Sequence, residues 1–288
     1  MAIYHCSIKI IGRSDGKSAV ASSAYRSGEK LTDDRTGLIH DFTKKRGVVF
    51  TEVSLPAHAP PEYADRNVLW NAVENIEKKS NAQLAREIEV ALPKELSREC
   101  LIEIVRRYVQ ENFVSFGMCA DWALHVARCP GDIGFARTGA ERRKGDGNPH
   151  AHIMLTMRGI KPDGSWAAKE KKIYALDEEG KRIPLIDPAT REQKLGKRNE
   201  KLWKRVTVEP NDWNDHSKAE IWRKSWADIC NEYLSLEQQI DHRSYKRQEL
   251  DLEPTIHEGY RARKMEKTGF VSNRCEYNRI IRKLNELK

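Results

Sequence analysis

The sequence predicts an α+β fold, in which an antiparallel β-sheet is flanked by helices. Segments of strand length with alternating or continuous apolar residues are separated by segments with apolar residues at helical spacing. The two kinds do not alternate as regularly as they would in a parallel sheet with crossover helices, and one-sided strands are typical of an antiparallel sheet. The expected strands lie at residues 2–11, 47–53, 86–92, 121–128 and 150–157.

Helices are expected where a capping residue precedes apolar residues at helical spacing. Ser18 would cap a short helix of small residues at 19–26, and Ser97 would cap a helix of about fifteen residues. The segment 160–215 is charged and is expected to be rich in loops. Further helices are expected at 63–79, 216–238 and 273–287.

The length of the chain, 288 residues, suits one large domain or a domain with a trailing extension, because single cores stop growing near ~250–300 residues. The tail from residue 242 onward is basic. We therefore expect one domain over residues 1–240 and a basic, DNA-contacting extension over 241–288 that packs on the same domain.

The composition restricts the class of protein. Lysine and arginine number 51 against 43 aspartates and glutamates, a net charge of +8, which suits a polyanionic partner but is also reached by many proteins without one. The six cysteines show no CxxC pair, so a disulfide scaffold is not expected. With no secretion signal and no run of ~20 apolar residues, we expect a cytoplasmic protein with no membrane segment.

The segment GNPHAHIML, residues 147–155, carries the strongest chemical signal. Residues two apart in a strand face the same side, so His150 and His152 point together and form half of a metal site. His125, in the preceding expected strand, is the candidate for a third ligand if the two strands pair. A His-x-His pair alone more often decorates a surface, and that alternative stays open.

Tyr25 ends the short helix of small residues. Small residues usually mean close packing against a sheet, and a tyrosine is an ordinary half-buried residue. The functional alternative is a nucleophile that DNA can approach closely. A phenolate that attacks a phosphodiester forms a covalent link, and a cation held by histidines would polarise and orient the phosphate.

Four segments of the chain carry a resemblance to the MobA/MobL relaxases, also called the MobQ class. The opening segment, YHCSIKIIGRSDGKSAVASSAYRSGEKL, is similar to the opening of that family. GDGNPHAHIMLTMRG is similar to its His-hydrophobic-His motif, the hallmark of HUH endonucleases, with Ala151 at the hydrophobic position. NAQLAREIEVALPKEL and SYKRQELDLEPTIHEGYRARKME resemble two further family blocks, at residues 81–96 and 244–266.

The resemblance implies the HUH relaxase fold and assigns roles to individual residues. Tyr25 would be the catalytic nucleophile, and the metal ligands would be His125, His150 and His152. Glu87 would orient a ligand histidine, although Glu89 shares its face and could take that role instead. The working metal would be Mg²⁺ or Mn²⁺, while three imidazoles also suit Zn²⁺, Ni²⁺ or Co²⁺. The interval between His125 and His150 is longer than the hairpin expected for the family.

The resemblance also implies a function in plasmid mobilisation or conjugation. Such a relaxase nicks and rejoins one strand at the origin of transfer through a 5′-phosphotyrosine, and it binds single-stranded and hairpin DNA. Accessory relaxosome proteins and a type IV secretion coupling protein would be further partners. Candidate DNA contacts, each of which could equally be an ordinary solvated side chain, are Arg13, Lys17, Arg26, Arg142, Arg143, Lys144, Arg243, Tyr245, Lys246, Arg247, Arg261 and Arg263.

Two other functions remain open. An HUH replication-initiator nuclease would use the same chemistry, but it usually places its tyrosine after the histidine motif, whereas Tyr25 precedes it. A non-catalytic DNA-binding protein would need the basic surface without the metal cluster. Covalent attachment to DNA, and its loss in Tyr25→Phe, would separate the enzymes from the binding protein.

Overall fold

The computed structural model describes residues 4–126 and 149–288 of the chain. The candidate DNA contacts Arg142, Arg143 and Lys144 therefore lie outside the described residues. The chain divides into two compact units, Met1–Ile240 and Asp241–Lys288. The prediction that the second unit packs on the first stays a prediction.

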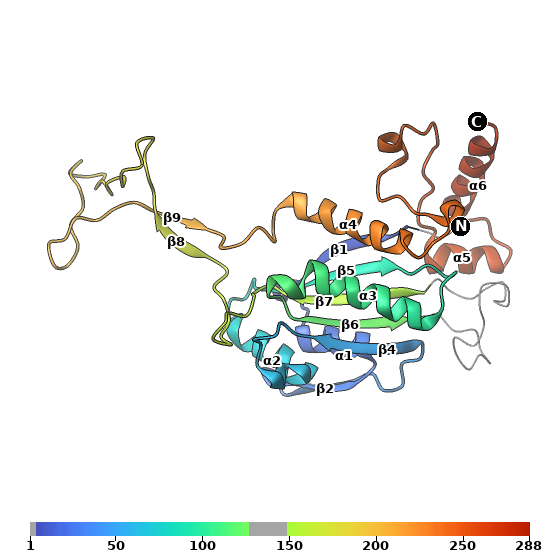
Figure 1. Ribbon diagram of the computed structural model, residues 1–288, viewed down its shortest axis with the longest axis horizontal. Coiled ribbons are helices and arrows are strands. Elements are labelled where there is room, and N and C mark those ends of the chain that lie inside the picture. The colour runs from blue at the N-terminus through green and yellow to red at the C-terminus, as the bar shows by residue number, and fades with distance from the viewer. Residues whose placement is uncertain (1–3, 127–148) are drawn as a thin grey trace. The chain divides into compact units, whose positions relative to one another are not determined.

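The first unit is built on a five-stranded sheet in which every neighbouring pair is antiparallel. The order is β1-β5-β7-β6-β4, so β7 lies in the middle of the sheet (Figure 1). This confirms the α+β class and the antiparallel sheet. The strands are β1 (Cys6–Gly12), β4 (Val48–Ser54), β5 (Gln83–Ala91), β6 (Ala120–His125) and β7 (His150–Thr156).

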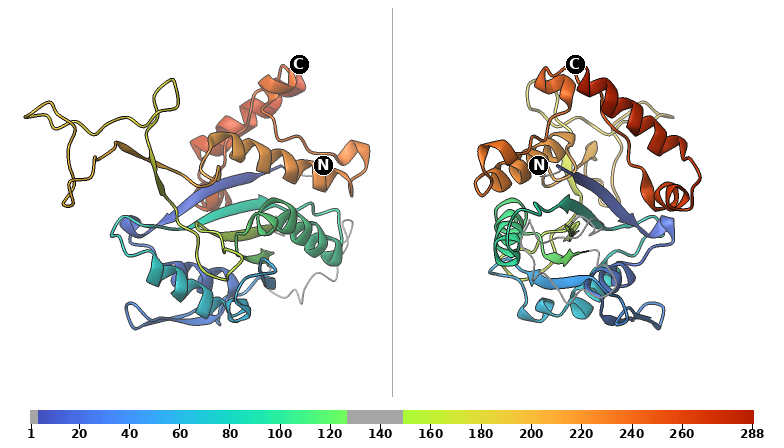
Figure 2. Two further views of the ribbon diagram at one scale, coloured as in Figure 1. Left: turned by 60° about the vertical axis from the view of Figure 1, so that its left-hand side comes forward. Right: turned by 90° about the vertical axis from the view of Figure 1, so that its right-hand side faces the viewer.

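The two faces of this sheet belong to two separate apolar clusters, covered by different helices (Figure 2). On one face, α3 (Arg98–Asn112) and α4 (His216–Asn231) pack against residues such as Trp122 and Ile153. On the other face, α1 (Ala19–Ser27) and α2 (Arg66–Ile76) pack against Met154 and Leu84. Because side chains alternate along a strand, His150 and His152 share the face of Met154, which is the face of α1 and α2.

The expected helix caps are present. Ser18 and Ser97 accept hydrogen bonds from the backbone amides of Ala21 and Cys100, which satisfies donors that a helix start leaves unpaired. Two expected helices have different bounds. The helix expected over 63–79 is the short 3-10 turn η2 (Pro61–Ala64) followed by α2, because Asp65 caps a new helix start. The helix expected over 216–238 ends at Asn231.

Several short elements escaped the sequence analysis. The hairpin of β2 (Lys30–Asp33) and β3 (Leu38–Asp41) has four-residue strands, and β3 exposes its apolar residues, so neither strand shows an amphipathic pattern. The expected loop-rich segment contains β8 (Lys171–Tyr174) paired with β9 (Arg205–Val208). The other elements described in the first unit are the 3-10 turns η1 (Arg13–Asp15), η3 (Val114–Phe116) and η5 (Leu236–Gln238).

The second unit contains a turn and two helices: η6 (Tyr245–Gln248), α5 (Gly259–Lys267) and α6 (Asn273–Glu286). The Asn278 side chain bonds the backbone of Ile256 through both its donor and its acceptor. Arg279 pairs with Glu266 and so links α6 to α5. Of the expected elements here, α6 is confirmed, and α5 was not expected. Among the helices that the model describes in either unit, none has the length and apolar character needed to span a membrane.

Candidate metal and nucleophile site

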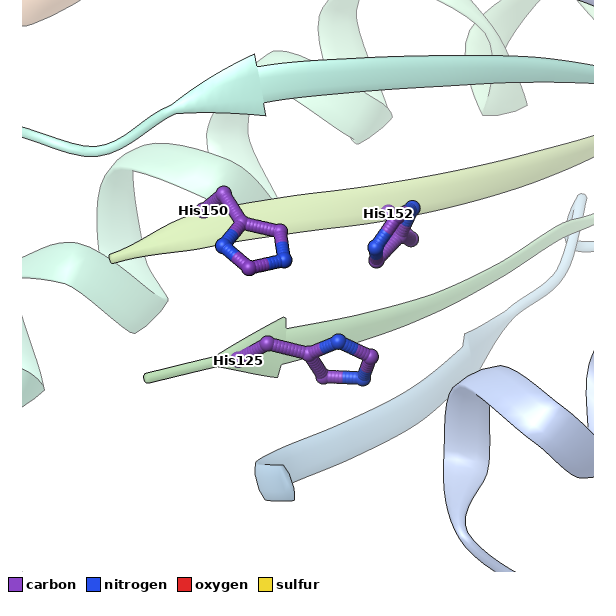
Figure 3. A group of neighbouring side chains, drawn as sticks. All are labelled: His125, His150 and His152. Atoms are coloured by element: carbon purple, nitrogen blue, oxygen red, sulfur yellow. The ribbon is translucent and has the colours of Figure 1, made fainter. Parts of the chain in front are cut away.

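Three histidines meet at the ends of the two central strands. The antiparallel register pairs His125 of β6 directly with His150 of β7, and the pleat places His152 on the same side two residues further on. Ring centroids are 5.3 Å apart for His125 and His150, 4.8 Å for His125 and His152, and 5.0 Å for His150 and His152. Figure 3 shows the three rings turned toward one another. Strand pairing thus brings His125 to the predicted pair.

His125 is buried, with 6% of its surface exposed. Burial lowers the pKa of its imidazole to about 3, with a smaller opposing effect from a hydrogen bond to the backbone of Arg26. The ring is therefore neutral near pH 7. Its Nε2 lies 2.6 Å from the Arg26 carbonyl oxygen. Because a carbonyl oxygen only accepts, Nε2 donates there and Nδ1 keeps the lone pair.

His152 is held by a carboxylate. Its Nδ1 lies 2.9 Å from Oε1 of Glu87, and the same oxygen lies 2.6 Å from the guanidinium of Arg26. Burial by itself would raise the pKa of Glu87, but the hydrogen bond from His152 and the charge of Arg26 lower it to about 2. The ionised carboxylate fixes the hydrogen on Nδ1 and leaves Nε2 of His152 with a lone pair. Glu89, the alternative, instead pairs with Lys9 at 3.2 Å.

The three side chains form a donor set that fits a divalent metal ion. One nitrogen from each ring can be chosen so that all three lie within 4.8 Å of one another. Neutral imidazoles are ligands for borderline divalent metals, and a carboxylate behind one of them is the usual support for a metal-bound histidine. Three protein ligands leave coordination positions open for a substrate oxygen.

Tyr25 lies in the last turn of α1, and 49% of the residue's surface is exposed. Together with Glu87 and Lys9 it lines a hollow of about 320 Å³ beside α1 and β1. The next residue, Arg26, contacts two parts of the histidine cluster, because its carbonyl meets His125 and its guanidinium meets Glu87. The end of α1 therefore lies against the cluster, with the phenol ring reachable from solvent.

Two buried carboxylates hold α1 in this place. Glu74 of α2 accepts from the backbone amide of Ala19 at 2.8 Å, at the start of the helix. Asp121 of β6 accepts from the hydroxyl of Ser23 at 2.5 Å, in its middle. Ala24, on the inner side of α1, is fully buried. The close packing expected from the small residues and the exposure of Tyr25 thus occur together.

Sequence analysis missed three residues that support the site: Asp121, Glu74 and Lys45. Asp121 carried a usable signal, a carboxylate inside an otherwise apolar strand. Glu74 lies in an expected helix, and only its burial at 2% exposure distinguishes it from a surface glutamate. Lys45, whose ammonium lies 3.6 Å from the centre of the Tyr25 ring, gave no signal at all.

The predicted DNA contacts fall into two groups. The guanidinium of Arg13 bonds the Glu74 side chain and the carbonyls of Glu74 and Lys79, the second of which lies beyond the end of α2. The guanidinium of Arg26 bonds Glu87, so both arginines have a structural role in the fold. Lys17 is exposed, and its Nζ lies 3.5 Å from Oδ2 of Asp15. The exposed candidates of the second unit are Arg243, Tyr245, Lys246, Arg247, Arg261 and Arg263. Contact with DNA stays a prediction for all of them.

Known proteins similar to this chain agree on one family. Residues 17–268 match the model of the MobA/MobL family. The chain is 42% identical over its whole length to a probable mobilization protein MobA of Bifidobacterium longum. Over 99% of its length it is 37% identical to a conjugal transfer protein TraA of Agrobacterium fabrum, and over 95% it is 35% identical to a mobilization protein MobL of Acidithiobacillus ferridurans.

A solved structure titled "Molecular Basis of Vancomycin Resistance Transfer in Staphylococcus aureus" has the same fold. The TM-score is 0.61 at 25% sequence identity, and the match covers 85% of this chain and 100% of that one. This chain spans 48% of the Bifidobacterium relative, 24% of the Agrobacterium relative and 66% of the Acidithiobacillus relative. On the extent of the family match and the identity to these relatives, the chain belongs to the MobA/MobL family.

Proposed function

We propose that this chain is the nicking domain of a plasmid mobilisation relaxase, which cuts and rejoins one DNA strand at an origin of transfer. One observation carries the proposal. The residue that follows the half-exposed Tyr25 contacts both His125 and the carboxylate that holds His152. The proposed nucleophile is therefore the chain neighbour of a residue that contacts the proposed metal site. The names of the relatives, which are mobilization and conjugal transfer proteins, support the same function.

The proposed reaction is a transesterification. The phenol oxygen of Tyr25 forms a bond to the phosphorus of one phosphodiester, and the bond from that phosphorus to the 3′ oxygen breaks. The phenol proton is lost, and the 3′ oxygen gains a proton and leaves as a free 3′-OH. The 5′-phosphate stays on Tyr25, so the energy of the broken bond is conserved and the reverse reaction rejoins the strand.

The histidines would hold the metal ion, which supplies positive charge to the non-bridging oxygens of the phosphate. Glu87 keeps His152 in the tautomer with a free Nε2, and the carbonyl of Arg26 does the same for Nδ1 of His125. Mg²⁺ or Mn²⁺ is the metal expected from the family resemblance, and the nitrogen ligands also suit Zn²⁺, Ni²⁺ or Co²⁺.

DNA would enter along the hollow beside Tyr25. Lys9 and Lys17 line this hollow and are exposed, so they can contact phosphates on either side of the cut. The full partner set of the proposal includes hairpin DNA at the origin, accessory relaxosome proteins and a type IV secretion coupling protein. Because plasmid DNA lies in the cytoplasm, the proposed place of action is the cytoplasm.

The test is covalent capture of single-stranded DNA. A randomised, 5′- or 3′-labelled oligonucleotide pool is incubated with the protein and Mg²⁺ or Mn²⁺, and denaturing gels report protein–DNA adducts. We expect adducts with the 5′-phosphate side of the cut, loss of adducts in EDTA, recovery when either metal is restored, and none with Tyr25→Phe. The matched control is Tyr277→Phe, which changes a tyrosine of similar exposure in α6, 42% against 49%.

Four outcomes contradict the proposal or narrow it. Adducts that persist in Tyr25→Phe show another nucleophile, and adducts that persist in EDTA show metal-independent chemistry. DNA binding without any adduct favours a non-catalytic DNA-binding protein. Adducts that form only on replication-origin DNA, and not on the transfer origin of the host plasmid, favour a replication initiator.

A further inference from the structure

Lys45 makes two contacts with the proposed nucleophile. Its Nζ lies 3.6 Å from the centre of the Tyr25 ring, which is the geometry of a cation–π contact. The same Nζ donates a hydrogen bond of 2.6 Å to the carbonyl oxygen of Tyr25. The Tyr25 ring also forms a T-shaped pair with the ring of Phe42, with centroids 5.3 Å apart and the planes at 87°. The ring is thus held on its face by an ammonium and is packed against a second ring.

The backbone after β3 places Lys45 over the end of α1. The Asp41 side chain accepts from the amide and the hydroxyl of Thr43, which turns the chain. The amide of Phe42 donates to the carbonyl of Glu29, just beyond α1, and the amide of Lys45 donates to the carbonyl of Phe42. The backbone of Lys45 is therefore fixed beside the end of α1, within reach of the Tyr25 ring and carbonyl.

No described acidic side chain neutralises the charge of Lys45. In the parts of the chain that the model describes, residues 4–126 and 149–288, no carboxylate forms an ion pair with it. Burial, followed by the nearby charge of Arg26, lowers the pKa of Lys45 to about 8, so the ammonium still carries its proton at pH 7. A half-buried ammonium whose contacts are a tyrosine's ring and carbonyl is suited to holding that tyrosine.

We propose that Lys45 is a positioning residue for the nucleophile: its ammonium clamps the Tyr25 ring and keeps the phenol oxygen directed to the scissile phosphate. This inference rests on the proposed function of Tyr25. The exposed ring would otherwise sample several rotamers, and each excursion would take the oxygen away from a productive geometry. The simplest other role is that of a cation capping the C-terminal end of α1, where a lysine near the last carbonyls is favourable.

The contact itself is tested without DNA. In protein labelled with ¹³C at lysine Cε, the Hε protons of Lys45 lie over the ring and are expected upfield of the other lysine signals. Lys45→Arg identifies the signal by removing it, and Tyr25→Leu returns it to the ordinary position. The matched control Lys44→Arg, one residue away and exposed, leaves the shifted signal in place. If no lysine signal is shifted in the wild-type protein, the clamp does not exist.

The role is tested by separating rate from affinity, with an oligonucleotide recovered as a covalent adduct from the randomised pool. We expect Lys45→Met to slow adduct formation at saturating DNA about tenfold, and Lys45→Arg to restore most of the rate because a guanidinium also stacks on aromatic faces. The dissociation constant, measured in the Tyr25→Phe background where the ring remains, is expected to change by less than about twofold. Lys44→Met should change neither quantity.

Other results overturn the inference in distinguishable ways. A dissociation constant that rises in parallel with the loss of rate, with a salt slope smaller by about one, assigns Lys45 to a DNA phosphate. A rate that Lys45→Met leaves unchanged, with only a lower melting temperature, assigns it to capping α1. If the wild-type protein forms no adduct, the proposed function fails and the positioning role fails with it, whatever the lysine signal shows.

Discussion

The two halves of the candidate site are held in different ways. The histidines stand on β6 and β7, in the interior of the five-stranded sheet, and the register of one strand pair places His125 opposite His150. Tyr25 stands on α1, a helix of nine residues, whose position depends on side-chain bonds to Glu74 and Asp121. The proposed metal half is therefore a product of backbone pairing, and the proposed nucleophile half is a product of a few buried polar contacts.

The difference follows from the physics of the two elements. A central strand is paired on both sides, so its position is shared among many hydrogen bonds. A helix shorter than ~12–15 residues is marginal by itself, and tertiary contacts must hold it. We therefore expect substitutions around α1 to change the reaction without changing metal affinity, while substitutions behind the histidines change metal affinity first.

Among the substitutions compared below, Asp121→Asn is expected to lower the free energy of unfolding the most. The carboxylate accepts from Ser23 and from the indole of Trp70 at 2.8 Å, and it pairs with Arg66 at 3.3 Å. Removing its charge leaves a buried arginine less compensated, so the free energy of unfolding should fall by about 3 kcal/mol. Denaturant unfolding measures this loss, and Asp34→Asn, at an exposed aspartate, is the control.

The same variant tests the comparison between the two halves. In the temperature range where Asp121→Asn is folded, adduct formation should slow because α1 loses its central anchor. Metal affinity, measured by calorimetry, should stay within about threefold of the wild-type value, since the strand register is unaffected. A metal affinity that falls as steeply as the rate would show that the two halves are not separately supported.

Glu87→Gln acts mainly on the metal half. The amide keeps the shape of the side chain but loses the charge that holds the hydrogen on His152, and metal affinity should fall about 10- to 100-fold. Glu89→Gln is the matched control, two residues along the same strand, where the carboxylate pairs with Lys9. Calorimetric titration with Mn²⁺ compares the two. An equal loss of metal affinity in the two variants would mean that the Glu87 carboxylate does not support His152 as a metal ligand.

The same contrast explains what sequence could predict. Strand periodicity and a His-x-His spacing are local patterns, so the sheet and the shared face of His150 and His152 follow from them. The proximity of His125 needed one further assumption, that two neighbouring strands pair. Lys45 lies twenty residues from Tyr25 in sequence, beyond a hairpin whose short β3 exposes Leu38 and Ile39. No local pattern encodes that contact, because it depends on how a weakly patterned hairpin folds back over α1.

The smallest expected effect is that of a single cap. Ser18 and Ser97 accept bonds of equal length, 3.3 Å each, from the first turns of α1 and α3. Replacing Ser97 by alanine should cost about 1 kcal/mol of unfolding free energy. Ser18→Ala should cost somewhat more, because the Ser18 hydroxyl also donates to the buried Asp33 at 2.9 Å. Only α1 carries the proposed nucleophile, so Ser18→Ala should slow adduct formation and Ser97→Ala should not, at temperatures where both variants are folded. Equal rates in the two variants would show that Tyr25 is positioned by its local contacts with Phe42 and Lys45 alone, independently of how firmly the start of its helix is held.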